Sequence, residues 1–230
     1  MKGVILAAGK GSRLGDNDLP KPLTVLENGQ SILGMQIAYL RPFLSIDSIF
    51  VVIGYHKEMI LDQFPELTFV YNPHFAEQNT SKSLLRALNK IQDDVLWING
   101  DVVFHSSLLP QLFAQKQSCM VVNQAGVDEE EVKYKTDGKG LILEVSKQVE
   151  NAEGEALGIN FFKKKDLPLL LEGLEHCAPT DYFEKGIEYA IQKGAKVRAY
   201  PVAENLCTEI DFPEDLVRAN QLIKSWEKSL

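Results

Sequence analysis

The sequence predicts an α/β protein with a mixed, mostly parallel sheet flanked by helices. Three short apolar runs, at 4–8, 49–54 and 67–71, are typical of buried strands because they offer apolar side chains to both faces. Helical patterns separate them, one capped by Ser31 and one spanning 57–64 before a proline. This β-α-β-α-β order favours parallel strands joined by right-handed crossovers.

The rest of the chain continues this alternation and adds an antiparallel part. The Asp137-Gly138 pair predicts a hairpin turn between strands at 133–135 and 141–147, which we expect to form a small lid. Pro201 indicates an edge strand. The other elements expected are helices at 82–91, 167–174, 181–193 and 213–229 and strands at 95–98, 119–123 and 195–202. With no linker, internal repeat or low-complexity tract, residues 1–230 are predicted to form one domain.

The composition is that of an ordinary acidic globule. Lys plus Arg number 24 and Asp plus Glu 32, which gives a net charge of −8 and argues against nucleic-acid or anionic-membrane binding. No apolar run reaches a membrane span of about 20 residues or forms a signal peptide, so we expect a cytoplasmic protein. The scattered Cys119, Cys177 and Cys207 are predicted to be free buried thiols.

A glycine-rich basic loop follows the first strand. Gly9, Gly11 and Gly15 alternate with Lys10, Ser12 and Arg13, a composition that suits backbone amides and an arginine directed at phosphate. The spacing matches neither the P-loop nor the dinucleotide fingerprint. An ordinary strand-to-helix turn is the alternative interpretation.

Four segments together resemble a known family. Residues 6–14 read Leu-Ala-Ala-Gly-Lys-Gly-Ser-Arg-Leu and 20–23 read Pro-Lys-Pro-Leu, while Asn-Gly-Asp stands at 99–101 and Glu-Ile-Asp at 209–211. These motifs resemble the nucleotidyltransferases that act on sugar phosphates and alcohol phosphates, and are most similar to the small phosphocholine-cytidylyltransferase-like enzymes. The resemblance implies a Rossmann-like fold of the nucleotide-diphospho-sugar transferase type.

The resemblance also implies which residues hold the nucleotide. Arg13 would bind the β- and γ-phosphates, and Lys21 would neutralise the α-phosphate during transfer. Asn79 could instead only cap a helix. The nucleotide-binding residues implied are Leu6, Ala7, Ala8, Gly9, Gly11, Ser12, Asn79, Ser83 and Gly100.

Two aspartates are implied as ligands of Mg²⁺. Asp101 follows a predicted strand, and ligands in open α/β sheets lie at the carboxyl ends of strands. In the family, the aspartates that match Asp101 and Asp211 hold the metal, which prefers oxygen ligands. Taken alone, each residue could simply cap the helix that follows it.

The acceptor side is less sharply defined. The resemblance implies contacts from Lys133, Lys147, Glu155, Asp181 and Tyr182. Surface lysines, a capping aspartate and a core tyrosine are the structural alternatives. For a quaternary ammonium acceptor, Tyr182, Phe183 and Trp97 could supply aromatic faces beside Glu155.

The implied activity is Mg²⁺-dependent transfer of a nucleoside monophosphate, most simply from CTP, to a phosphorylated small alcohol or phosphonate such as phosphocholine. A hexose-1-phosphate nucleotidylyltransferase is the first alternative, although Ser12 and the short segment after Gly15 depart from that branch. A non-catalytic nucleotide sensor is the second, and the paired aspartates argue against it. The expected partners are an NTP and a phosphorylated acceptor, and a homodimer stays open.

Overall fold

The structure is a computed structural model that describes residues 1–11, 14, 19–124 and 131–228. Its strands are β1 (Lys2–Ala7), β2 (Ile49–Ile53), β3 (Thr68–Tyr71), β4 (Val95–Asn99), β5 (Val102–Phe104), β6 (Ser118–Val122), β7 (Lys133–Thr136), β8 (Ile142–Ser146), β9 (Gly154–Phe162), β10 (Val197–Pro201) and β11 (Cys207–Glu209). The helices are α1 (Ile32–Leu40), α2 (Lys57–Gln63), α3 (Thr80–Leu88), α4 (Leu108–Phe113), α5 (Leu167–His176), α6 (Phe183–Gln192) and α7 (Pro213–Glu227), and a short 3₁₀ turn, η2, spans Lys21–Leu23.

The central sheet is mixed and mostly parallel, as predicted. Its strand order is β10-β6-β9-β4-β1-β2-β3, which places β10 and its Pro201 at an edge. The pairs β1–β2, β1–β4, β2–β3 and β10–β6 are parallel, whereas β9 runs antiparallel between β4 and β6. Leu6 pairs with both Val52 and Asn99, so the carboxyl ends of β1, β2 and β4 meet at one edge.

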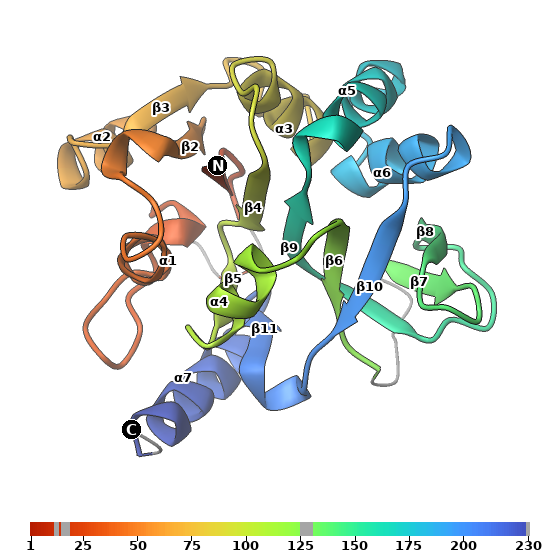
Figure 1. The fold of residues 1–230 in the computed structure, drawn as a ribbon. Helices are drawn as coiled ribbons and strands as arrows, with labels where there is room; N and C mark the ends of the chain where they lie inside the picture. Colours follow the sequence, from red (N-terminus) through yellow and green to blue (C-terminus); the bar gives the residue numbers. More distant parts are fainter. Residues whose placement is uncertain (12–13, 15–18, 125–130, 229–230) are drawn as a thin grey trace.

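Helices cover both faces of this sheet (Figure 1). Each face is apolar because successive side chains along a strand point to opposite sides. Val4 and Leu6 of β1 pack into a core shared with α3, α5 and α6. Ile5 and Ala7 face the other way, into a core shared with α1, α2 and α4. Both cores are largely inaccessible to water, which fixes the register of the strands.

Two antiparallel units complete the fold. The predicted hairpin consists of β7 and β8, and β7 also pairs with β9. At its turn Gly140, and not Gly138, takes the positive φ of +78°. The pairing of β5 with β11, which the sequence did not suggest, brings residues 207–209 onto the segment after β4.

Two further expectations concern the cysteines and the membrane. All three cysteines are buried free thiols, which confirms the prediction. Across the described parts of the chain, every helix is too short or too polar to cross a bilayer.

Candidate active site

The glycine-rich loop packs directly on Lys21. Gly11 has a φ of +62°, and a Cβ at that position would lie 2.6 Å from the Cβ of Lys21, so a glycine is required there. Gly9 and Gly11 both line the cavity described below. Ser12 and Arg13, which we predicted to bind phosphate, lie outside the described residues.

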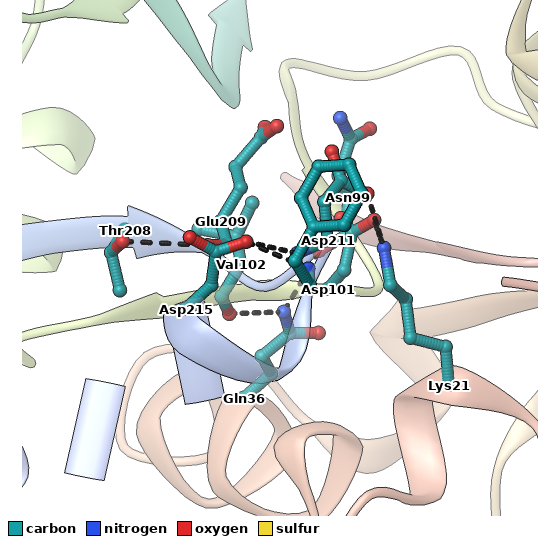
Figure 2. Close-up of polar contacts among 10 residues, drawn as sticks. Lys21, Gln36, Asn99, Asp101, Val102, Thr208, Glu209, Asp211 and Asp215 are labelled. Carbon is teal, nitrogen blue, oxygen red and sulfur yellow. Dashed lines mark hydrogen bonds and ion pairs between the residues drawn. The ribbon is translucent and has the colours of Figure 1, made fainter. Parts of the chain in front are cut away.

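Lys21 joins two carboxylates from distant parts of the chain (Figure 2). Its ammonium lies 2.9 Å from Asp101 Oδ2 and 2.6 Å from Asp211 Oδ1, and its side chain is only 8% exposed. Burial alone would lower the pKa of Lys21, but the two aspartates outweigh it and the pKa is raised. The ammonium is therefore held firmly in its charged form.

The turn that carries Asp101 is held from two sides. The Gly100 amide donates to Leu6 O at 2.9 Å, and a Cβ on Gly100 would lie 2.7 Å from that oxygen. From α1, the fully buried Gln36 donates through Nε2 to Asn99 O at 2.9 Å and to Val102 O at 2.8 Å. Asp101 is thus positioned by β1 and α1 and not by capping a helix.

Asp211 lies between β11 and α7. The carboxylate of Asp215 accepts from the amides of Asp211 and Phe212, at 2.9 and 2.7 Å, so Asp215 makes the helix-capping contacts that we considered for Asp211. This leaves the Asp211 carboxylate turned toward Lys21. Glu209, two residues earlier, pairs across the strands with Val102.

These groups line a cavity of about 630 Å³ at the carboxyl ends of β1 and β4. A small hollow of about 60 Å³ adjoins it. The predicted residues that line the large cavity are Leu6, Ala7, Gly9, Gly11, Lys21, Asn79, Gly100, Asp101, Lys147, Glu155, Tyr182 and Asp211. Ala8 and Ser83 line the small hollow instead.

Asn79 and Ser83 have structural partners. Asn79 caps α3, accepting through Oδ1 from the Thr80 amide at 2.8 Å, which is the alternative role considered for it. It nevertheless lines both hollows. The buried Ser83 hydroxyl accepts from Asn72 Nδ2 at 3.1 Å.

Of the residues predicted to bind the acceptor, some line the cavity and others do not. The Lys147 ammonium lies 4.9 Å from the centre of the Tyr182 ring, and both line the cavity. Lys133 does not line it. Asp181 also lies outside the lining, and its carboxylate accepts from the Ala178 amide at 2.7 Å, which favours a structural role.

Trp97 cannot supply the aromatic face considered for it. The ring is completely buried and packs on Phe162 and Phe183, at centroid distances of 5.0 and 5.6 Å. Phe183 is itself 1% exposed, although it borders the cavity.

Glu155 is held by Asn123, which donates to its carboxylate through Nδ2. Burial first, and the nearby Glu131 second, raise the pKa of Glu155 to about 7, while the Asn123 contact acts in the opposite direction. The Glu155 carboxyl therefore titrates near neutral pH, which a solvent-exposed glutamate would not do.

The sequence interpretation missed several cavity residues. Glu184 and Glu209 line it with carboxyl groups, and Arg218 lines it from α7. Burial raises the pKa of Glu184 to about 7, and that of Glu209 rises through burial and through Asp101 and Asp211. Only Glu209 carried a sequence signal, since it belongs to the Glu-Ile-Asp motif.

The chain is similar in sequence to nucleotide-transferring proteins. Residues 3–154 match the profile of the MobA-like NTP transferase domain. The chain is 26% identical over 238 residues to the bifunctional protein GlmU of Methanocaldococcus jannaschii, covering 97% of this chain and 54% of that protein. It is 25% identical over 242 residues to the CMP-5'-(3-aminopropyl)phosphonate synthase of Streptomyces rubellomurinus, covering 96% of this chain and 38% of that protein.

The chain spans about half the length of GlmU. By contrast, the UTP–glucose-1-phosphate uridylyltransferase AglF of Haloferax volcanii, 26% identical over 240 residues, is matched over 97% of both chains.

Two solved structures share the fold. The inositol-1-phosphate CTP transferase of T. maritima superposes with a TM-score of 0.80 at 20% identity, covering 100% of this chain and 97% of that one. The CTP:phosphocholine cytidylyltransferase LicC of Streptococcus pneumoniae gives 0.78 at 18% identity, covering 96% and 98%. The predicted fold type and the predicted resemblance are confirmed.

Proposed function

This chain belongs to the MobA-like NTP transferase domain family, and on that premise we propose that it is a nucleotidyltransferase. In the proposed reaction a nucleoside monophosphate passes from CTP to a phosphorylated small alcohol or a phosphonate, and pyrophosphate is released. The observation that carries the proposal is the convergence of Lys21, Asp101 and Asp211 beside a glycine-rich loop.

The residues present fit a divalent metal ion. Asp101 and Asp211 converge on one point, where the Lys21 ammonium lies. The other oxygen of Asp101, Oδ1, is buried and has no hydrogen-bond partner. A hard cation such as Mg²⁺ would satisfy that oxygen and, when bound between the two carboxylates, would neutralise charge on the transferring phosphate.

The protein's own part in the reaction is positioning and charge neutralisation. An anionic oxygen of the acceptor attacks the α-phosphorus; the new P–O bond forms while the bond to the β-phosphate oxygen breaks, and pyrophosphate leaves with that electron pair. No proton has to be removed, because the nucleophile is already charged. The Lys21 ammonium, held permanently charged, is placed to stabilise the α-phosphate as negative charge builds on it.

CTP is the proposed donor because three of the similar proteins bear names that specify a cytidine nucleotide. The small hollow, which Leu6, Ala8, Gly9, Asn79 and Ser83 help to line, is the proposed position of the base. A second candidate is transfer to a hexose 1-phosphate, which the full-length similarity to AglF favours.

Pyrophosphate release with Mg²⁺ tests the proposal. CTP, UTP, GTP, ATP and dTTP would each be assayed against phosphorylated alcohols, phosphonates and hexose 1-phosphates. Turnover with CTP and an alcohol-type acceptor is the expected result. Turnover with hexose 1-phosphates alone would select the second candidate, and tight nucleotide binding without any release would point to a sensor.

A further inference from the structure

The cavity has an acidic end that the proposed nucleotide transfer does not use. Among the described residues that line the cavity, seven are acidic and three are basic. Lys21 offsets two of the acidic ones, Asp101 and Asp211. Five remain, and three of them, Glu155, Glu184 and Glu209, come from three different elements, β9, α6 and β11.

Glu184 has an oxygen that lacks a partner. The side chain is 7% exposed, and its Oε2 is buried without a hydrogen bond although the residue lines the cavity. A buried carboxylate oxygen left in this state costs free energy, because the water it lost has not been replaced. The oxygen is therefore satisfied best by a hydrogen-bond donor that enters the cavity.

The donors already present in the protein do not fill this role. The Lys147 ammonium is close enough to lower the pKa of Glu184, but it lies over the Tyr182 ring and makes no hydrogen bond to Oε2. The missing group is thus a donor, and positive charge on it would also offset the neighbouring carboxylates of Glu155 and Glu209.

A quaternary ammonium group does not meet this requirement. It has no N–H to donate, and it is usually recognised by aromatic faces. Here Trp97 and Phe183 are committed to the core, at 0% and 1% exposure. In the described part of the chain, the two other aromatic residues that line the cavity are Tyr182, whose ring already has the Lys147 ammonium 4.9 Å from its centre, and the half-exposed Phe212, which directly follows Asp211 in the chain.

We propose that the organic end of the acceptor carries a primary ammonium group, which donates a hydrogen bond to Glu184 in the field of Glu155 and Glu209. This inference rests on the proposed function and specifies its acceptor as an aminoalkyl phosphate or aminoalkyl phosphonate. Glu184 then determines which acceptors are used, whereas Lys21, Asp101 and Asp211 act on the phosphate that is transferred.

A methylation series tests the inference without changing the protein. The acceptors are 2-aminoethyl phosphate and its N-methyl, N,N-dimethyl and N,N,N-trimethyl derivatives, assayed with CTP and Mg²⁺ by pyrophosphate release. The charge stays the same along the series while the N–H donors fall from three to none. We expect kcat/KM to fall at least about 10-fold from the first to the last member, the loss typical of one charge-assisted hydrogen bond.

A variant pair tests the residue. Glu184→Gln should lower kcat/KM for 2-aminoethyl phosphate by about 10- to 100-fold and flatten the methylation series. The matched control is Glu188→Gln, one turn further along α6, whose carboxylate pairs with Lys185 at 2.6 Å and does not line the cavity. The control should keep the full preference.

Other results would contradict either the inference or the proposed function. Equal or better use of the trimethyl acceptor, or faster turnover with glycerol phosphate or inositol phosphate, would overturn the inference and leave nucleotide transfer standing. No pyrophosphate release with any phosphorylated acceptor would refute the proposed function, and this inference with it. An unchanged series in Glu184→Gln would remove Glu184 from the explanation.

Discussion

Replacing Lys21 by methionine removes the one ammonium that the structure places between Asp101 and Asp211. Breaking a buried ion pair by removing one partner costs about 3–5 kcal/mol when the remaining charge stays dry. Here Asp101 and Asp211 are 26% and 38% exposed, so water can resolvate both and the loss should be smaller. We expect a loss of about 2 kcal/mol in unfolding free energy without divalent ions, or about 4–8 °C in Tm.

The decisive measurement is the response of Tm to Mg²⁺ in the absence of nucleotide. In Lys21→Met the two carboxylates face each other without a counter-ion, so Mg²⁺ should raise the Tm of the variant more than that of the wild type. Because the pKa of Lys21 is raised, its ammonium stays charged and the difference between the proteins should stay constant from pH 7 to pH 10.

Lys163→Met is the matched control. Lys163 pairs with Asp94, both side chains are 26% exposed, and the pair does not line the cavity. This variant should lose stability that Mg²⁺ does not restore. If Mg²⁺ stabilised Lys21→Met and the wild type equally, Asp101 and Asp211 would not be the metal site and the reasoning would fail.

Three further changes have defined outcomes. Asp101→Ala should lower turnover by about two to three orders of magnitude, because in the proposed reaction this residue acts on the transferring phosphate, and circular dichroism should show an intact fold. Gly100→Ala should destabilise the protein by at least about 2 kcal/mol in chemical denaturation, since its Cβ would lie 2.7 Å from Leu6 O, whereas Gly138→Ala, with no atom within 4 Å, should change stability by less than about 0.5 kcal/mol. Glu184→Gln should gain stability over the wild type as pH rises from about 4.5 to 7, because the raised pKa of about 7 means that ionisation destabilises the wild-type fold over that range, by up to about 3 kcal/mol. The Tm curves of the two proteins should therefore converge near pH 4 and be fully separated at pH 8.

Local patterns were enough to predict most of the fold. The apolar runs and the helical spacing up to Tyr71 predicted β1, α1, β2, α2 and β3, because each element is set by its own periodicity. The pairing of β5 with β11 was not predicted, since each strand is three residues long and the two lie about a hundred residues apart. Strands this short carry no alternation that can be recognised.

The site residues also fall into those that the sequence could predict and those that it could not. Lys21, Asp101 and Asp211 stand in motifs, and the structure brings them together. Glu184 has no motif around it, and its importance comes from burial that only the tertiary packing creates. Trp97 shows the opposite error, because an aromatic residue in a strand was considered for the site and packs entirely into the core.

The β5–β11 pairing also determines when the site can exist during synthesis. Lys21 lies 80 residues before Asp101 and 190 residues before Asp211. A ribosome adding about 5–20 residues per second therefore completes the set of charged groups roughly 10 to 40 s after Lys21 has been made. For the first 80 residues of that interval Lys21 has neither carboxylate, and for the rest it has only Asp101. The strand β11, which pairs with β5, leads directly to Asp211 and so completes the site. Formation of the binding site is thus a late step in folding, so a chain that binds nucleotide has already assembled both of its distant halves.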